Sequence, residues 1–224
     1  METQVHVSDT SAPTSYFDRA YRDYEAQNPP RKTDHYLDQV EALVTPGRHD
    51  MLDVGCGLGS FLRRATERLP EWGLSGSDIE LSAVETTQQL VPAATIVRAS
   101  ATERPFPAGS FDAITAWDVI EHVPDRDAVA ASVSQMLRPG GLFLFVVPVY
   151  DGILGPVIRR LDRDPTHVHK EGREFWLNWA SRSFEVLEWH GMFRYLLGRY
   201  YVHIPTRRLR SSATAILVVC RSPG

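Results

Sequence analysis

Three glycines at alternate positions and one isolated aspartate form the pattern in this sequence with the clearest chemistry. Gly55, Gly57 and Gly59 follow the apolar run Met51–Val54, and Asp78 ends the next apolar run. A glycine turn between a strand and a helix lets backbone amides approach a ligand closely. A carboxylate at the tip of the neighbouring strand is placed to bind both hydroxyls of a ribose. The pattern predicts a site for a nucleoside-containing ligand, although an ordinary tight turn and a helix cap at Asp78 also fit these residues.

The spacing of the glycines and a nearby carboxylate indicate which nucleoside ligand is expected. A dinucleotide-binding turn reads G-x-G-x-x-G, but here Ser60 occupies the third glycine position. A phosphate-binding loop requires a lysine after its last glycine, and none follows Gly59. Asp53 would repel a pyrophosphate and suits a ligand that carries an ammonium or a sulfonium charge. S-adenosylmethionine has both charges, a ribose and no phosphate, so it is the expected cofactor.

Five segments, in order along the chain, resemble the motifs of class I S-adenosylmethionine-dependent methyltransferases. The resemblance extends over roughly residues 50–148 and more loosely over the rest. It implies an α/β fold with a Rossmann-like, doubly wound, mostly parallel sheet of seven strands, of which the last is antiparallel. We therefore expect a cytoplasmic enzyme that methylates an oxygen or nitrogen of a small molecule, with a secondary metabolite as the expected kind. The five segments are Leu52–Gly59, Gly76–Asp78, Pro105–Asp112, Trp117–Asp125 and Leu137–Gly141.

Apolar runs and helical patterns alternate along the chain, as in a parallel doubly wound sheet. We expect residues 1–13 to be disordered and residues 14–224 to form one methyltransferase domain. Within it, residues 14–45 should form two helices separated by Asn28-Pro-Pro30. Residues 148–182 form an insertion after the fifth strand, and together with these helices they should cover the substrate above the carboxyl ends of the strands. The expected strands are Met51–Val54, Trp72–Ser77, Thr95–Ala99, Ala113–Trp117, Leu142–Val147, Phe184–Trp189 and Ala213–Val219; the expected helices include Phe61–Leu69, Arg126–Leu137 and Glu174–Ala180.

The resemblance assigns roles to residues around the cofactor. Asp78 would accept hydrogen bonds from the ribose, Ile79 would pack on the adenine, and Asp53 would lie near the ammonium group. Ser100 stands where many relatives have an acidic residue, which weakens the expected contact with the adenine amine. Trp117 is expected to shape the sulfonium pocket or stack on substrate, or else to cap the core. The expected cofactor set is Tyr16, Tyr21, Asp53, Gly55, Cys56, Gly57, Gly59, Asp78, Ile79, Ser100, Ala101, Thr102 and Trp117.

Histidines supply the candidates for a general base. Methyl transfer is an in-line displacement, so catalysis depends mainly on the alignment of donor and acceptor. A general base matters mainly when the acceptor is a hydroxyl. His122 follows the fourth expected strand and has a pKa range suited to this role, although a structural histidine fits equally well. His167 and His169 would point the same way on an extended segment; with Asp162 or Asp164 such a pair can bind a metal, but we expect none. The expected substrate contacts are Tyr24, Tyr150, His122, His167 and Trp176.

Composition and charge narrow the class of partner. A net charge of −4 disfavours general nucleic-acid binding, and the longest apolar run, Leu142–Val149, is too short to span a bilayer. Cys56 and Cys220 lie far apart, which suits a reducing compartment without disulfides. We expect a small-molecule substrate, no nucleic acid, no membrane, and a monomer or homodimer. Two alternatives stay open: transfer to RNA or protein, which the arginines between positions 194 and 210 favour, and a non-catalytic binding protein.

Overall fold

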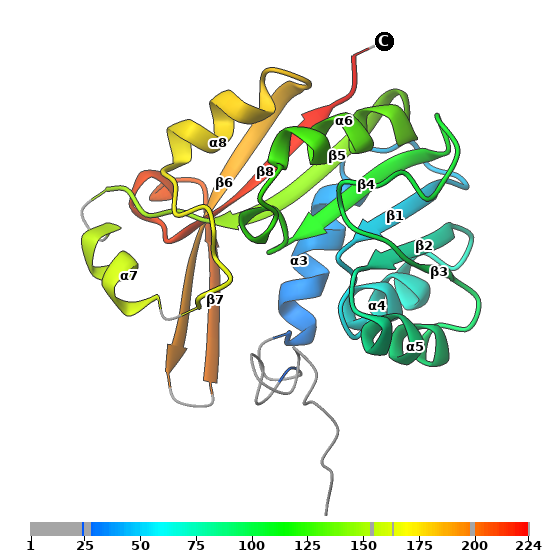
Figure 1. The fold of residues 1–224 in the computed structure, drawn as a ribbon, viewed down its shortest axis with the longest axis horizontal. Coiled ribbons are helices and arrows are strands. Elements are labelled where there is room, and N and C mark those ends of the chain that lie inside the picture. The colour runs from blue at the N-terminus through cyan, green and yellow to red at the C-terminus, as the bar shows by residue number, and fades with distance from the viewer. Residues whose placement is uncertain (1–23, 25–27, 153–154, 163, 198–199, 224) are drawn as a thin grey trace, which may run out of the picture.

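In the computed structural model, a mixed sheet of eight strands is covered by helices on both faces (Figure 1). The structure describes residues 24, 28–152, 155–162, 164–197 and 200–223. The expected disordered tail and most of the first N-terminal helix, with Tyr16 and Tyr21, lie outside the described residues. Among the described residues, no helix combines the length and apolar character that a bilayer crossing requires.

The order of elements follows the predicted alternation of strands and helices from β1 to α6, except that no helix separates β3 from β4 among the described residues. The strands are β1 (Asp50–Val54), β2 (Gly73–Asp78), β3 (Thr95–Arg98), β4 (Phe111–Trp117), β5 (Leu137–Pro148), β6 (Glu185–Leu197), β7 (Tyr200–Thr206) and β8 (Ala215–Arg221). The helices are α3 (Pro30–Glu41), α4 (Ser60–Arg68), α5 (Leu81–Leu90), α6 (Arg126–Met136), α7 (Gly155–Leu161) and α8 (Arg173–Ala180), with the 3-10 turns η1 (Ile120–His122) and η2 (Arg210–Ser212).

The sheet has a parallel half and an antiparallel half. Its strand order is β3-β2-β1-β4-β5-β8-β6-β7, and β1 to β5 pair in parallel. β8 is antiparallel to both β5 and β6, as expected for the last strand. Because the carboxyl ends of parallel strands meet at one edge, the loops after β1, β2 and β4 come together there.

The expected count of seven strands was wrong, because the sixth strand does not end at Trp189. β6 continues to Leu197, and the chain then returns as β7, which pairs with the second half of β6. Gly191 lies where β6 changes partners, opposite Thr206 of β7 and Ile216 of β8. A Cβ at this glycine would lie 2.5 Å from Cα of Arg210, so the close approach of the chain requires glycine here.

Two apolar cores lie on the two faces of the sheet. The alternate residues Phe143 and Phe145 of β5 pack with α6 and α8 on one face, whereas Leu144 and Val146 pack with α3 and α4 on the other. Figure 1 shows α6 and α8 on the opposite side of the sheet from α3 and α4. A strand that is buried on both faces reads as a continuous apolar run, which is why β5 was clear from the sequence.

Candidate functional site

A cavity of about 570 Å³ opens at the carboxyl ends of β1, β2 and β4. Its walls come from the turn after β1, the end of β2, the segment after β4, and α3. Residues 164–167 of the long segment after β5 also line it, as does Arg194 of β6. The cavity therefore joins parts of the chain that are up to 170 positions apart, from Tyr24 to Arg194.

The glycine turn after β1 forms one end of the cavity, which we call the cofactor end. Gly55 has φ +69° and Gly57 has φ +55°, values that side-chain-bearing residues rarely adopt. A Cβ at Gly55 would lie 2.4 Å from Cγ2 of Val119, so a side chain is excluded there as well. The amides of Gly55 and Cys56 donate to the carbonyl oxygen of Ser77 at 2.7 and 3.0 Å, which ties the turn to the end of β2.

Asp78 lies at the last position of β2 and faces this turn. Its carboxylate oxygens accept hydrogen bonds from the amides of Gly57 and Glu80, each at 2.9 Å. Burial raises the pKa of the Asp78 carboxyl, while these backbone amides oppose that shift. Ile79 follows directly and lines the cavity with a side chain that is 62% exposed, so a flat apolar group has a surface to cover.

Asp53 is a buried carboxylate on the floor of the cavity. It is 2% exposed, and its Oδ1 accepts a hydrogen bond of 2.7 Å from the Thr115 hydroxyl. Burial raises its pKa to about 7, and the charge of Asp78 adds to the shift. Burial disfavours the ionised form of this carboxylate. A cationic group on a ligand would stabilise that form, because the opposite charges attract.

Trp117 ends β4 and belongs to both the cavity wall and the core. Its ring stacks on Tyr36 of α3 at a centroid distance of 4.3 Å and meets Phe61 of α4 edge-on at 5.3 Å. Within the described part of the chain, its indole nitrogen is buried and has no hydrogen-bond partner. The two expected roles for this residue, lining the cavity and capping the core, are thus combined in one position.

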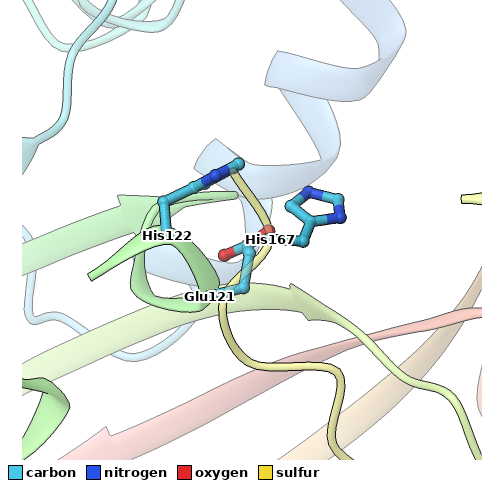
Figure 2. Close-up of side chains that lie close together, drawn as sticks. All are labelled: Glu121, His122 and His167. Carbon is cyan, nitrogen blue, oxygen red and sulfur yellow. The ribbon is translucent and has the colours of Figure 1, made fainter. Parts of the chain in front are cut away.

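The other end of the cavity, which we call the acceptor end, contains Glu121, His122 and His167. One ligand-type atom from each side chain lies within 4.8 Å of the others, and Figure 2 shows the Glu121 carboxylate beside the two imidazole rings, whose centroids are 4.6 Å apart. The amides of Val168 and His169 both donate to the carbonyl oxygen of Glu121 at 3.1 Å. These backbone hydrogen bonds attach the 164–169 segment to η1.

Hydrogen bonds orient both imidazole rings at the acceptor end. Nδ1 of His122 lies 2.8 Å from the hydroxyl oxygen of Thr166, which itself donates to Asp164, so Nδ1 is the donor to Thr166. Nδ1 of His167 lies 2.9 Å from a carboxylate oxygen of Asp162 and donates to it. In this arrangement, Nε2 of each ring carries the lone pair. Burial and the neighbouring His167 lower the pKa of His122, which favours its neutral form.

A further charged residue, Asp118, lines the cavity but was not among the expected site residues. Asp118 follows β4 with φ +59°, and its carboxylate pairs with Arg194 of β6 and, at 3.6 Å, with Lys32 of α3. Burial would raise the pKa of Asp118, but the two cations lower it below the usual range. Asp and Asn tolerate a positive φ best among side-chain-bearing residues, so this conformation is accessible to Asp118.

Several expected site residues do not line the cavity. Trp176 was expected to contact substrate, but it is fully buried, because α8 packs Trp176, Trp179 and Ala180 against the sheet. The His169 ring turns away from the cavity, with Nε2 3.0 Å from the carbonyl oxygen of Val123. Tyr150 reaches the site indirectly, through hydrogen bonds with Asp162 and His167. Gly59 and Thr102 also lie outside the lining.

Most of the remaining expected residues do line it. Tyr24 is among them, and its hydroxyl oxygen accepts a hydrogen bond from the Leu58 amide at 3.3 Å. Burial raises the pKa of Tyr24 to about 12, so its hydroxyl keeps its proton. The expected residues that line the cavity are Tyr24, Asp53, Gly55, Cys56, Gly57, Asp78, Ile79, Ser100, Ala101, Trp117, His122 and His167.

Comparison with known proteins places the central region in a recognised family. Residues 52–145 match the family model described as a methyltransferase domain. The chain is 36% identical over 114 residues to nocamycin O-methyltransferase of Saccharothrix syringae, a match that covers 48% of this chain and 38% of that protein. It is 37% identical over 119 residues to ubiquinone biosynthesis O-methyltransferase of Xanthomonas campestris pv. campestris, which covers 48% of this chain and 47% of the relative. The chain thus spans less than half the length of either relative.

Solved structures share the fold over a longer stretch. A S-adenosylmethionine-dependent methyltransferase from Thermotoga maritima, described as a possible histamine N-methyltransferase, superposes with a TM-score of 0.68. The match covers 92% of this chain and 98% of that one at 14% identity, so it concerns the fold alone.

Proposed function

We propose that this chain is a class I S-adenosylmethionine-dependent methyltransferase and that it methylates an oxygen of a small molecule. The observation that carries the proposal is that one cavity has a ribose-type carboxylate at one end and oriented imidazoles at the other. Oxygen is preferred to nitrogen because both curated relatives are named O-methyltransferases. The cavity is of the size that suits a small acceptor beside a nucleoside cofactor.

The cofactor end has the groups that S-adenosylmethionine requires. Asp78 would accept hydrogen bonds from the ribose hydroxyls, Ile79 would pack against the adenine, and Asp53 would lie near the ammonium group. The raised pKa of Asp53 supports this assignment. Ionising a buried carboxyl costs free energy, and a nearby cationic group of the ligand would offset that cost. When bound, S-adenosylmethionine supplies a methyl group that is activated by its sulfonium.

The acceptor end has the groups that would position and deprotonate a hydroxyl. His122 is the first candidate for the general base and His167 the second, because Nε2 of each carries a lone pair at the cavity. Residues 164–167 and α3 would form the walls around the acceptor and exclude water. The methyl carbon is already activated by the sulfonium. Alignment of the acceptor oxygen with that carbon would therefore account for most of the lowering of the activation barrier, roughly 7–11 kcal/mol in well-oriented systems.

Calorimetry with S-adenosylmethionine and with NAD tests the cofactor. We expect micromolar binding of S-adenosylmethionine and none of NAD, and tight binding of NAD would refute the proposal. Asp78→Ala should weaken binding by roughly 10–150-fold, since a charge-assisted hydrogen bond contributes about 1.5–3 kcal/mol. The matched control is Glu80→Ala, which leaves the ribose carboxylate in place.

Turnover is tested by mass spectrometry of S-adenosylhomocysteine, with a panel of phenols, aliphatic alcohols and amines as acceptors. Formation of S-adenosylhomocysteine in the presence of a phenol or an alcohol supports the proposal. Formation of S-adenosylhomocysteine with amines alone contradicts transfer to oxygen. His122→Ala should lower turnover and spare cofactor affinity. An unchanged rate in that variant would transfer the role of base to His167.

A further inference from the structure

We infer that Glu121, His122 and His167 form a binding site for a divalent transition-metal ion, with zinc as the expected ion. Each of the three side chains contributes one ligand-type atom, and these atoms lie within 4.8 Å of one another (Figure 2). Two imidazoles and one carboxylate are a ligand set that zinc and its neighbours in the periodic table accept. The sequence suggested a different pair, His167 with His169, but the His169 ring is turned toward Val123.

Glu121 is the observation that points to a ligand. Its side chain is 1% exposed, and its Oε2 is buried without a hydrogen-bond partner among the described residues. A buried carboxylate in this state is costly unless it is paired with a cation or coordinates a metal. A cation bound in the cavity would supply the partner that Oε2 lacks among the described residues.

The histidines are held as metal-ligating histidines usually are. Such a histidine donates its second ring N–H to a carboxylate, a carbonyl or a hydroxyl, which fixes the tautomer and the ring plane. His167 donates to Asp162, and Asp162 is itself held by Tyr150 at 2.6 Å and Lys170 at 2.9 Å. His122 donates to Thr166. Both rings thus keep Nε2 as the lone-pair nitrogen at the cavity.

The geometry suits a site with an open position. Zinc–nitrogen and zinc–oxygen bonds are about 2.0–2.2 Å, so ligand atoms in a tetrahedral site lie about 3.3–3.6 Å apart. The three ligand-type atoms lie within 4.8 Å of one another, so binding of an ion would draw them closer together. All three residues line the cavity, so a fourth position would face an incoming acceptor. Catalytic zinc sites have this composition, with three protein ligands and one position for water or substrate.

The catalytic consequence of this ion rests on the proposed function, whereas its binding does not. Coordination to the ion would lower the pKa of an acceptor hydroxyl, which would then release its proton to solvent. The histidines would then serve as ligands, and their role as general base would apply to the ion-free protein. Phenols and enols, whose oxygen gains most from such activation near neutral pH, are the acceptor class that this site favours.

Zinc binding is tested on the full chain after treatment with a chelator and dialysis. We expect one zinc ion per chain by elemental analysis and a single binding isotherm with zinc chloride. Glu121→Gln keeps the shape of the buried side chain and should weaken zinc binding by more than the roughly 10–100-fold that outer partners contribute. His167→Gln should have a similar effect. Circular dichroism and thermal melting verify that both variants are folded.

His169→Gln is the matched control, because it changes the neighbouring histidine of the same segment. This variant should retain zinc with an affinity within a few-fold of the wild-type value. The inference is overturned if the wild-type chain binds no zinc, if Glu121→Gln binds zinc as well as the wild type does, or if His169→Gln loses it.

The same samples separate this inference from the proposed function. Calorimetry with S-adenosylmethionine on Glu121→Gln should show unchanged cofactor affinity. Loss of zinc binding with intact cofactor binding supports a separate cation site. A wild-type chain that binds zinc but no S-adenosylmethionine would refute the proposed function and leave the cation site standing.

Discussion

The two ends of the cavity are built in different ways. The cofactor end is formed by the turns and side chains at the ends of two neighbouring parallel strands, and its key residues lie between positions 53 and 79. The acceptor end brings Glu121 and His122 together with a segment more than 40 positions later, through hydrogen bonds to the carbonyl oxygen of Glu121. The first is therefore fixed by the sheet, whereas the second depends on how two loops meet. This difference predicts that the two ends can be damaged separately.

The largest effect is expected at the glycine turn. Gly55→Ala should destabilise the fold by about 2–4 kcal/mol, because it combines the cost of a positive φ with a clash against Val119. Urea denaturation measures this change. The matched control is Gly109→Ala, where φ is +64° but nothing lies within 4 Å of the new Cβ. A cost for Gly55→Ala no greater than that of the control would show that the turn tolerates a side chain.

A smaller effect is expected at Asp118, which pairs with groups from both sides of the cavity. Asp118→Asn keeps the positive φ and removes the charge that Arg194 and Lys32 face, so we expect a loss of about 1–3 kcal/mol. Asp34→Asn is the control, since Asp34 also pairs with two cations, Arg64 and Arg68, whose side chains are 36% and 23% exposed, against 8% and 12% for Lys32 and Arg194. Such solvent-accessible pairs contribute about 0–1 kcal/mol. Equal losses in the two variants would contradict a special role for the cavity pair.

Asp53→Asn should change stability and cofactor affinity in opposite directions. The folded protein holds a proton on Asp53 up to about pH 7, whereas the unfolded chain releases it near pH 4. Unfolding therefore becomes easier as pH rises through this window, and the variant removes that dependence. We expect a higher Tm than wild type at pH 8 with little difference at pH 4, and weaker binding of S-adenosylmethionine at pH 8. A lower Tm at pH 8 would contradict this account of Asp53.

The smallest effect is expected at Tyr24. Tyr24→Phe removes the hydroxyl that accepts from the Leu58 amide at 3.3 Å and leaves the ring in place. We expect a two- to five-fold loss of cofactor affinity by calorimetry, which corresponds to a weak hydrogen bond of about 0.5–1 kcal/mol. A loss as large as that of Asp78→Ala would show that Tyr24 contacts the cofactor directly.

The parallel half of the sheet could be predicted from the sequence, because each strand is a short apolar run that ends at a turn. β1 to β4 appear within two residues of their expected bounds. β7 could not be predicted, since its polar and aromatic residues have no clear period and its partner is the second half of β6. Local patterns specify an element only where the buried face repeats along the chain.

The same distinction holds for the site. Asp53, Gly55, Gly57 and Asp78 were found because backbone turns and strand ends have recognisable spacing. Glu121 was missed, since one acidic residue in a loop is ordinarily solvated and only the fold shows its burial. Trp176 was misplaced for the converse reason: an aromatic residue in a long segment after β5 suggests a cover, but its helical spacing with Trp179 and Ala180 directs it into the core.

The attachment of the 164–169 segment to Glu121 uses main-chain atoms on both sides. Amides and carbonyls are present whatever side chains the segment carries, so these two hydrogen bonds do not depend on the residues at positions 166 and 167. Substitutions at those positions would change the lining of the cavity and the side-chain hydrogen bonds, but not this backbone attachment.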